Sequence, residues 1–501
     1  MSALTVSPFR RALRTDLNSS LVVFLVALPL CVGVAVASGV PAELGLVTGI
    51  VGGVVTGMLP GSSLQVSGPA AGLTVLVAEA VDTYGLPALG VIVLAAGLLQ
   101  LALGALKLGR WFRAISIAVV EGMLAGIGLV IIAGQLYAMA DIKAPASGLD
   151  KITGLPGLLA DLATSGTAAA AFGVGAGTIA VIVLWSRMPA RVRVVPGALA
   201  AVVLATATTA LLGLSTDKVH VEGLLGSIQP PGLDEVSRLG EVGLLGTVVA
   251  FTLIASAESL FSAAAVDRLH DGPRTDYDKE LMAQGAGNTL CGLLGALPMT
   301  AVIVRSAANV QAGARTKASR VLHGVWLLLF AALLPDVLGV IPLAALAGVL
   351  VHAGFKLLPV KQLGPLWREH RGEAVILGVT ALAIVTVNMF EGVLIGLVLA
   401  VAKSAWETSH IHVTVDDRAD EDEDEDGDSH RPIRVVVTGN ATFLRLPKML
   451  DTLEALPTDR PVELDLLGLR HLDHACRTAL TTWTQRHNAK ATVPVRLIHA
   501  E

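Results

Sequence analysis

The sequence is poor in charge, in aromatic side chains and in cysteine. Only 15% of its 501 residues are charged and 4% are aromatic, whereas 53% are hydrophobic. Polar groups this scarce cannot cover the surface of a water-soluble protein, so a membrane protein is indicated. The three cysteines, Cys31, Cys291 and Cys476, are far apart, which argues against a disulfide framework and a zinc site.

Long apolar segments recur along most of the chain. A helix that crosses a bilayer needs about 20 apolar residues. Twelve segments approach this length: 17-38, 43-60, 87-107, 113-138, 166-186, 194-214, 244-266, 278-296, 319-334, 337-354, 373-388 and 389-405. Arg10, Arg11 and Arg14 precede the first segment as in a signal peptide, but no cleavage site follows, so we expect that segment to be retained.

Two further apolar segments are short and interrupted by glycine and proline. They read VSGPAAGLTVLVAEAV, at 66-81, and GALPMTAVIVRSAANV, at 295-310. Paired broken helices in the two halves of a membrane chain are typical of transporters that hold an anion at mid-membrane. With them the number of spans reaches about fourteen, which predicts a polytopic α-helical membrane protein.

The first broken segment offers backbone donors for an anion. Pro69 suits the first position of a helix. The backbone N–H groups of Ala70 and Ala71 would then face the anion without the help of a charged side chain. The alternative is an ordinary helix start after a turn.

Lysine and arginine are concentrated in alternate connections between the apolar segments. These connections lie around 107-113, 187-193, 268-274, 315-320 and 356-371. Because cationic loops remain in the cytoplasm, we expect both termini to be cytoplasmic and the segments 138-165 and 215-243 to lie outside. The protein is accordingly expected in the cytoplasmic membrane.

The composition changes after Ala405. A strongly acidic run ends the apolar part, and IRVVVTG then begins an alternation of strand-like and helix-like segments. Like-charged runs stay solvated, whereas the alternation predicts a small α/β domain. We therefore expect a cytoplasmic N-terminus at 1-16, a transmembrane domain at 17-405, a flexible acidic linker at 406-431 and the α/β domain at 432-501.

Several of these segments together resemble one family. The resemblance lies in PLCVGVAVASGVPAELGL, QVSGPAAG, AESLFSAAAVDRL, GAGNTLCGLLGALPMTAVIVRSAANVQAGA and VELDLLGLRHLDHA. Over nearly the whole chain, the sequence is similar to the SulP family of sulfate permease-like anion transporters with a C-terminal STAS domain. The resemblance implies an inverted repeat of seven plus seven spans, a core that moves against a gate, and an anion held between two half-helices.

Arg305 is a basic residue inside the apolar stretch AVIVRSAANV. An uncompensated arginine in a membrane costs at least about 2.5 kcal/mol, so its side chain should face a cavity. The resemblance matches Arg305 to a basic residue near the anion site of some animal members, and the amides of Ile303 and Val304 to the second half-helix end. The alternative is that Arg305 pairs with an acidic residue or a carbonyl to hold two helices together.

Glu258 is the only acidic residue of its apolar segment, and Ser262 follows four residues later on the same helical face. In the bicarbonate transporters of the family, a carboxylate and a hydroxyl at this spacing bind sodium, which makes Glu258 and Ser262 candidate coupling-ion ligands. The family has the shorter aspartate there. The glutamate could instead carry a proton, balance Arg305, or be purely structural.

Leu30 and Val34 correspond, by the same resemblance, to residues of the first helix that line the substrate pocket. Both are apolar in this chain. Such a wall leaves selectivity to size, charge and backbone donors. It favours a small inorganic anion, and a small dicarboxylate stays open.

The C-terminal domain has Asp473, His474 and Ala475 where STAS domains usually carry a phosphorylatable serine. Phosphorylation at that position is therefore not expected. The variant resembles SulP proteins that are fused to, or encoded beside, carbonic anhydrase, which favours bicarbonate as substrate and makes carbonic anhydrase a candidate partner.

The predicted function is secondary active transport of sulfate or bicarbonate, coupled to sodium or protons. The alternatives are a dicarboxylate transporter and an uncoupled anion channel on the same fold. An enzyme is not expected, because the sequence has no HExxH, GxSxG or Walker motif. We expect a homodimer in the lipid bilayer, without cofactor, bound metal or nucleic acid.

Overall fold

The computed structural model describes residues 8–114, 116–189, 191–192, 195–221, 223–416 and 432–498. The chain divides into two compact units, Met1–Leu397 and Val398–Glu501. The first unit is almost entirely helical, and the second contains a five-stranded sheet. This confirms the predicted class, a polytopic helical protein followed by a small α/β domain.

Helices make up most of the membrane part of the chain. The first half contains α1 (Pro8–Ala37), α2 (Ala42–Val51), α3 (Thr74–Tyr84), α4 (Leu86–Ala105), α5 (Ile117–Met139), α8 (Gly166–Trp185) and α9 (Gly197–Leu212). The second contains α11 (Val242–Val266), α12 (Tyr277–Leu293), α13 (Ile303–Gln311), α14 (Ala318–Leu333), α15 (Leu343–Leu357), α17 (Arg371–Thr386) and α18 (Met389–Thr408). Connections contain α6 (Gly148–Thr153), α7 (Leu155–Thr164), α10 (Leu233–Ser237) and α16 (Val360–Glu369).

Each of the twelve long apolar segments overlaps one of these helices. Among the described residues, seven helices are long and apolar enough to cross a membrane by themselves. Several others, such as α9 and α14, are apolar but shorter. The number of fourteen spans therefore stays a prediction.

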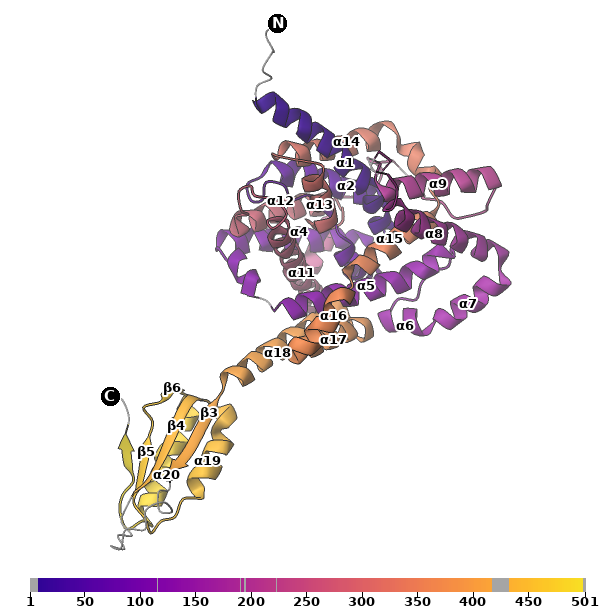
Figure 1. Ribbon diagram of the computed structural model, residues 1–501. Helices are drawn as coiled ribbons and strands as arrows, with labels where there is room; N and C mark the ends of the chain where they lie inside the picture. Colours follow the sequence, from indigo (N-terminus) through magenta and orange to yellow (C-terminus); the bar gives the residue numbers. More distant parts are fainter. Residues whose placement is uncertain are drawn as a thin grey trace. The chain divides into compact units, whose positions relative to one another are not determined.

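The helices form two bundles (Figure 1). In the first bundle, α1, α2 and α4 pack with α11, α12 and α14, and α13 packs against α1 and α11. In the second, α5 packs with α8, α15 and α17, and α8 packs with α9. Close approach in the first bundle depends on glycine: a Cβ on Gly292 of α12 would lie 2.2 Å from the backbone N of Leu94 in α4. The α1 helix also contacts α9 and α15, so it borders both bundles.

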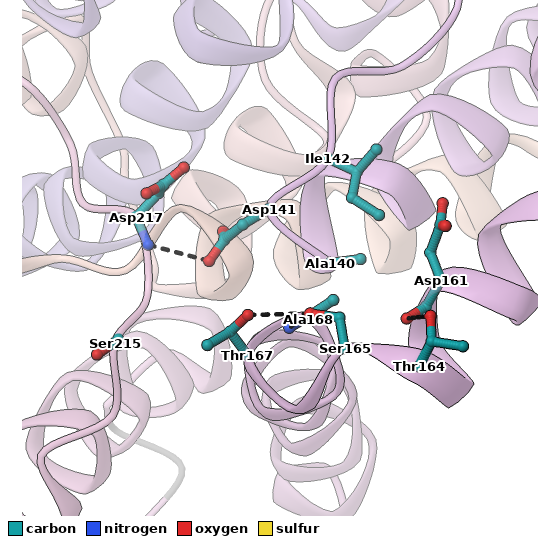
Figure 2. Close-up of a pocket in the computed structure, with 10 residues that line it drawn as sticks. All are labelled: Ala140, Asp141, Ile142, Asp161, Thr164, Ser165, Thr167, Ala168, Ser215 and Asp217. Atoms are coloured by element: carbon teal, nitrogen blue, oxygen red, sulfur yellow. Dashed lines mark hydrogen bonds between the residues drawn. The ribbon is translucent and has the colours of Figure 1, made fainter.

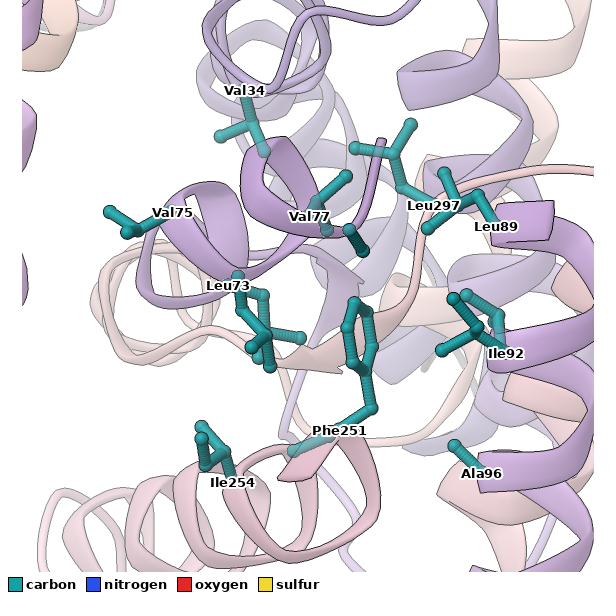
Figure 3. Packing of buried hydrophobic residues seen from close by; sticks show 14 of the residues in the cluster. Val34, Leu73, Val75, Val77, Leu89, Ile92, Ala96, Phe251, Ile254 and Leu297 are labelled. Atoms are coloured by element: carbon teal, nitrogen blue, oxygen red, sulfur yellow. The ribbon is translucent and has the colours of Figure 1, made fainter. Parts of the chain in front are cut away.

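The largest cluster of buried apolar side chains surrounds the two broken segments. In Figure 3 the ring of Phe251, from α11, lies between Leu73 and Ile92, and Leu297 belongs to the same cluster. Phe251 is completely buried. Lipid tails are as apolar as these side chains, so within a membrane the cluster stabilises the broken segments by close packing.

The second unit is a sheet with two helices, α19 (Leu446–Glu454) and α20 (His474–Asn488). Its strands are β3 (Ile411–Asp416), β4 (Ile433–Ala441), β5 (Val462–Asp465), β6 (Leu469–Leu472) and β7 (Arg496–Ile498). The β3 strand is antiparallel to β4, whereas β4 is parallel to β5 and β6, and β5 to β7. Val435 and Val437 point into the core with Met449 and Leu464, as the alternation of β4 predicts.

The sheet begins earlier than the sequence suggested. Because β3 precedes the acidic run and pairs with β4, the predicted domain start at residue 432 is too late, and the helix α18 extends beyond the predicted linker start at 406. HIHVTVD has the alternation of a strand, but its charged continuation obscured it. The acidic residues 417-431 lie outside the described part of the chain.

The connection from α18 to β3 consists of Ser409 and His410. The Ser409 hydroxyl shares a hydrogen bond with the Thr442 hydroxyl, 2.5 Å away, and its carbonyl accepts one from Arg445 Nε at 2.7 Å. The Arg445 guanidinium also lies 4.3 Å from the centre of the Trp406 ring. The described part of the predicted linker, 406-416, thus consists of the end of α18, this short hydrogen-bonded junction and β3, whereas the flexibility of the acidic part stays a prediction.

Candidate functional site

The two broken segments meet in a pair of short strands. The strands β1 (Ser67–Pro69) and β2 (Met299–Ala301) are antiparallel, with Gly68 opposite Thr300. The first half-helix follows β1 as a 3-10 turn (Ala71–Leu73) and α3, and the second begins at the start of α13. Pro69 is part of β1, so the prediction that it occupies the first helical position is wrong.

Side chains from three helices hold the strand pair in place. Asn288 of α12 accepts a hydrogen bond from the Met299 backbone N at 2.7 Å and donates one to the Met299 carbonyl at 3.1 Å. Ser259 of α11 accepts from the backbone N of Ala301, and Ser306 of α13 accepts from that of Val66. The half-helix N-termini, which carry free N–H groups and the positive end of the helix dipole, are thus fixed beside each other.

A cavity of about 820 Å³ adjoins the strand pair and is lined by side chains of both bundles. We call it the inter-bundle cavity. All nine predicted site residues line it: Leu30 and Val34 of α1, Ala70 and Ala71 of the first half-helix, Glu258 and Ser262 of α11, and Ile303, Val304 and Arg305 of α13. The structure therefore brings together residues separated by up to 275 positions in the sequence, from Leu30 to Arg305 (305 − 30).

Arg305 is completely buried. Its Nη2 donates to the Pro69 carbonyl at 3.2 Å, whereas its Nε and Nη1 have no hydrogen-bond partner among the described residues. The guanidinium lies against Gly68, where a Cβ would come 2.2 Å from Nη1. The alternative of a carbonyl contact between two elements is present, but one carbonyl leaves most of this buried charge uncompensated.

Glu258 lies against the start of the first half-helix. A Cβ on Gly72 would lie 2.5 Å from one carboxylate oxygen and 2.8 Å from the other. Glu258 Oε2 is buried and has no hydrogen-bond partner in the described structure. No ion pair joins Glu258 to Arg305 within the described residues, so a cation or a proton is the better match for the free oxygen.

Two basic side chains of the cavity were not predicted as site residues. His352 and Lys356, both on α15, line its second-bundle side. Lys356 had been assigned to a cationic loop, because the predicted span ended at residue 354 whereas the helix ends at Leu357. Their spacing of four residues in a helix is the signal that could have identified them.

A smaller pocket of about 430 Å³ lies elsewhere, among α7, α8 and the connections that follow α5 and α9 (Figure 2). Asp141, Asp161 and Asp217 line it, and the backbone N of Asp217 donates to Asp141 Oδ2 at 3.0 Å. Burial raises the pKa of the Asp141 carboxyl group. None of the predicted site residues lies there. Within the described residues, no group of three or more histidine, cysteine or acidic side chains is arranged to hold a metal ion.

Comparison with solved structures supports this arrangement of elements. The chain is similar to the transmembrane domain of a cyanobacterium bicarbonate transporter, BicA, with 25% identity, a TM-score of 0.65, and coverage of 78% of this chain and 98% of the other. It also shares the fold of SLC26A9, with 15% identity, a TM-score of 0.76, and coverage of 98% and 84%.

The sequence comparisons agree with the fold. The "Putative sulfate transporter YvdB" of Bacillus subtilis is 29% identical over 77% of this chain and 72% of its own length. The "Bicarbonate transporter BicA" of Picosynechococcus is 25% identical over 82% and 74%. These names are those of transporters, as predicted, and not of enzymes. The model of the sulfate permease family matches residues 13–380, and the chain belongs to that family.

Proposed function

We propose that this multi-pass membrane protein carries a small inorganic anion, sulfate or bicarbonate, across the cytoplasmic membrane by secondary active transport. The observation that carries the proposal is the convergence of two half-helix N-termini and the buried Arg305 on one cavity. Helix N-termini attract anions through free N–H groups and the helix dipole. The uncompensated guanidinium adds a full positive charge where desolvation makes it most effective.

Glu258 is the proposed coupling group. A carboxylate among anion donors would repel the substrate unless a sodium ion or a proton neutralised it. Ser262, one helical turn away and lining the same cavity, supplies a second oxygen for sodium. Anion and cation would then enter together, and the first bundle would move as a core against the second bundle, the gate.

We infer from the residues of its wall that the inter-bundle cavity opens toward the cytoplasm. Beyond the strand pair, the wall includes Trp185 and Ser186 at the end of α8 and Lys356 near the end of α15. Both helix ends lead into the cationic connections assigned to the cytoplasm, which supports an inward-facing state with cytoplasmic termini.

In this proposal the STAS-like second unit modulates transport. We also propose that the protein forms a homodimer and that carbonic anhydrase is a candidate partner.

One alternative substrate is favoured by a specific observation. The cavity of about 820 Å³ exceeds the size of a single inorganic anion, and Leu30 and Val34 contribute apolar surface. These features would accommodate the carbon chain of a small dicarboxylate.

Uptake into proteoliposomes distinguishes these functions. Purified protein is reconstituted and supplied with labelled sulfate, bicarbonate or fumarate under an imposed sodium or pH gradient. We expect saturable, gradient-driven accumulation of sulfate or bicarbonate and little fumarate uptake. Accumulation of fumarate alone would favour the dicarboxylate alternative, and unitary currents without accumulation would favour a channel.

The coupling role is tested by Glu258→Gln. Glutamine keeps the side-chain size and removes both the charge and the titratable proton, so we expect anion binding to persist while uptake no longer depends on the driving cation. Gradient-driven accumulation in proteoliposomes is the measurement, and Ser215→Ala, in the smaller pocket, is the control. If the Glu258→Gln variant still concentrates the anion as steeply as the parent, Glu258 is structural.

A further inference from the structure

The second-bundle wall of the inter-bundle cavity carries a pair of basic side chains. His352 and Lys356 lie four residues apart on α15 and both line the cavity, together with Ala353 between them. Residues at this spacing occupy the same helical face. The pair therefore lies on the wall that α15 contributes, whereas Arg305 belongs to the first bundle.

The cavity contains few other groups that can carry charge. Among its described lining residues, the titratable ones are Glu258 and Arg305 from the first bundle and His352 and Lys356 from the second. The elements packed against α15, namely α1, α5, α8 and α9, contribute only apolar or neutral side chains to the lining. Glu121 of α5 and Arg187 after α8 are near in sequence to lining residues but do not line the cavity.

We propose that His352 and Lys356 form the gate-side half of the anion site, and that protonation of His352 sets the preference between divalent and monovalent anions. The inference rests on the proposed anion transport. In this proposal His352 of α15 selects the charge of the anion, whereas the half-helices supply a positive potential that does not change with pH.

The reasoning is electrostatic. Lys356 supplies one fixed positive charge. The imidazole of His352 is partly buried and lies one helical turn from that charge, so it gains its proton only toward the acid end of the range from about pH 5 to pH 8. With His352 protonated, the pair carries two positive charges and matches a dianion such as sulfate; with His352 neutral, it carries one. Because the attraction between charges scales with their product, the extra charge favours a dianion over a monoanion.

The test uses reconstituted full-length protein, labelled sulfate as the dianion, and nitrate as a competing monoanion, since neither changes charge in this range. For the parent, we expect the KM for sulfate to be about five- to tenfold lower at about pH 5.5 than at about pH 8, with little change in the inhibition constant of nitrate. His352→Gln should give a ratio of the sulfate KM to the nitrate inhibition constant that no longer changes with pH, because proton coupling through Glu258 would affect both anions alike. Lys356→Gln should raise the KM for sulfate at both pH values while keeping the pH dependence.

Lys361→Gln is the matched control, because Lys361 is exposed on α16 and does not line the cavity. Its KM should equal that of the parent at both pH values. The proposal is overturned if His352→Gln keeps the pH dependence of the ratio of the sulfate KM to the nitrate inhibition constant, or if Lys356→Gln changes the KM for sulfate no more than Lys361→Gln does.

Failure of the transport function would look different. In that case no variant and no parent protein would take up sulfate. Sulfate binding to the detergent-solubilised protein, measured by calorimetry at the same two pH values, still tests the pair: loss of the pH dependence in His352→Gln supports it, and identical affinities in parent and variant contradict it.

Discussion

Two glycines of the first broken segment each leave room for one charged group. Gly68 accommodates the Arg305 guanidinium, and Gly72 accommodates the Glu258 carboxylate. A sequence reading that treats these glycines only as helix breakers misses this role. Because Gly68 and Gly72 are only four residues apart, both charged groups lie beside the same short segment of backbone.

The Gly72 position gives a direct prediction. In Gly72→Ala, the new Cβ would lie 2.5 Å from Glu258 Oε1, so the carboxylate must move. We expect gradient-driven uptake to fall strongly and stability to drop by about 1–3 kcal/mol. Uptake in proteoliposomes and thermal unfolding measure the two effects.

Gly177→Ala is the control for this substitution. Gly177 lies in α8, and a Cβ there would meet nothing within 4 Å. Its uptake and stability should match or slightly exceed those of the parent, because alanine favours a helix over glycine. If Gly72→Ala behaves like Gly177→Ala, the close contact with Glu258 has no functional weight.

Ala70 tests the anion donors of the first half-helix. In Ala70→Glu, a fixed negative charge among the N–H donors should lower uptake by at least about a hundredfold, equivalent to about 2.7 kcal/mol, while the protein still folds. Ala70→Gln, which has the same bulk without the charge, is the matched control. Undiminished uptake by Ala70→Glu would locate the anion elsewhere.

At the scale of elements, the sequence predicted helices better than strands. Apolar length is a local signal, and all twelve long segments overlap helices. The pairing of Ser67 with Ala301 joins residues far apart in sequence, and each of its strands has only three residues. No local pattern specifies such a contact.

Some of the residues that line the inter-bundle cavity can be singled out from the sequence. The residues at half-helix ends and the lone intramembrane charges Glu258 and Arg305 are visible in sequence because they interrupt apolar segments. The glycine contacts and the position of His352 depend on which helix faces the cavity. That is a property of packing between the two bundles.

The segment before β1 is held by long polar side chains of other elements. Arg320 of α14, only 2% exposed, donates to the carbonyl of Leu59 at 3.0 Å and to that of Gln65 at 3.4 Å. Glu280 of α12 accepts from the backbone N of Ser62 at 2.7 Å. These contacts determine where β1, and hence the first half-helix, begins.

Arg320→Gln should therefore disturb the site from a distance. Loss of two hydrogen bonds from a charged donor is expected to cost about 2–4 kcal/mol of stability and to reduce uptake. Arg320→Lys should recover part of both, because one charged donor remains. Arg315→Gln, at an exposed position, is the control. Equal unfolding temperatures for Arg320→Gln and Arg315→Gln would contradict a stabilising role for the hydrogen bonds of Arg320.

At the scale of the whole molecule, the sheet is expected to modulate transport and not to perform it. All nine predicted site residues, with His352 and Lys356, belong to the first unit. Truncation after His410 removes every strand from β3 onward and keeps α18. We expect uptake to remain within about tenfold of the parent rate, equivalent to about 1.4 kcal/mol in the barrier.

The truncated protein must first be shown to be monodisperse by size-exclusion chromatography. Uptake is then measured in proteoliposomes at equal protein content. Complete loss of uptake from a monodisperse truncated protein would show that the sheet is required for transport.

The short junction between α18 and β3 has a mechanical consequence. Hydrogen bonds from Arg445 and Asn440 fasten the carbonyls of Thr408, Ser409 and His410 to the sheet. A tether of two fastened residues cannot absorb a rotation, so the last turn of α18 and the sheet would turn as one lever arm. A molecule that grips the sheet would thereby move the last turn of α18 together with it.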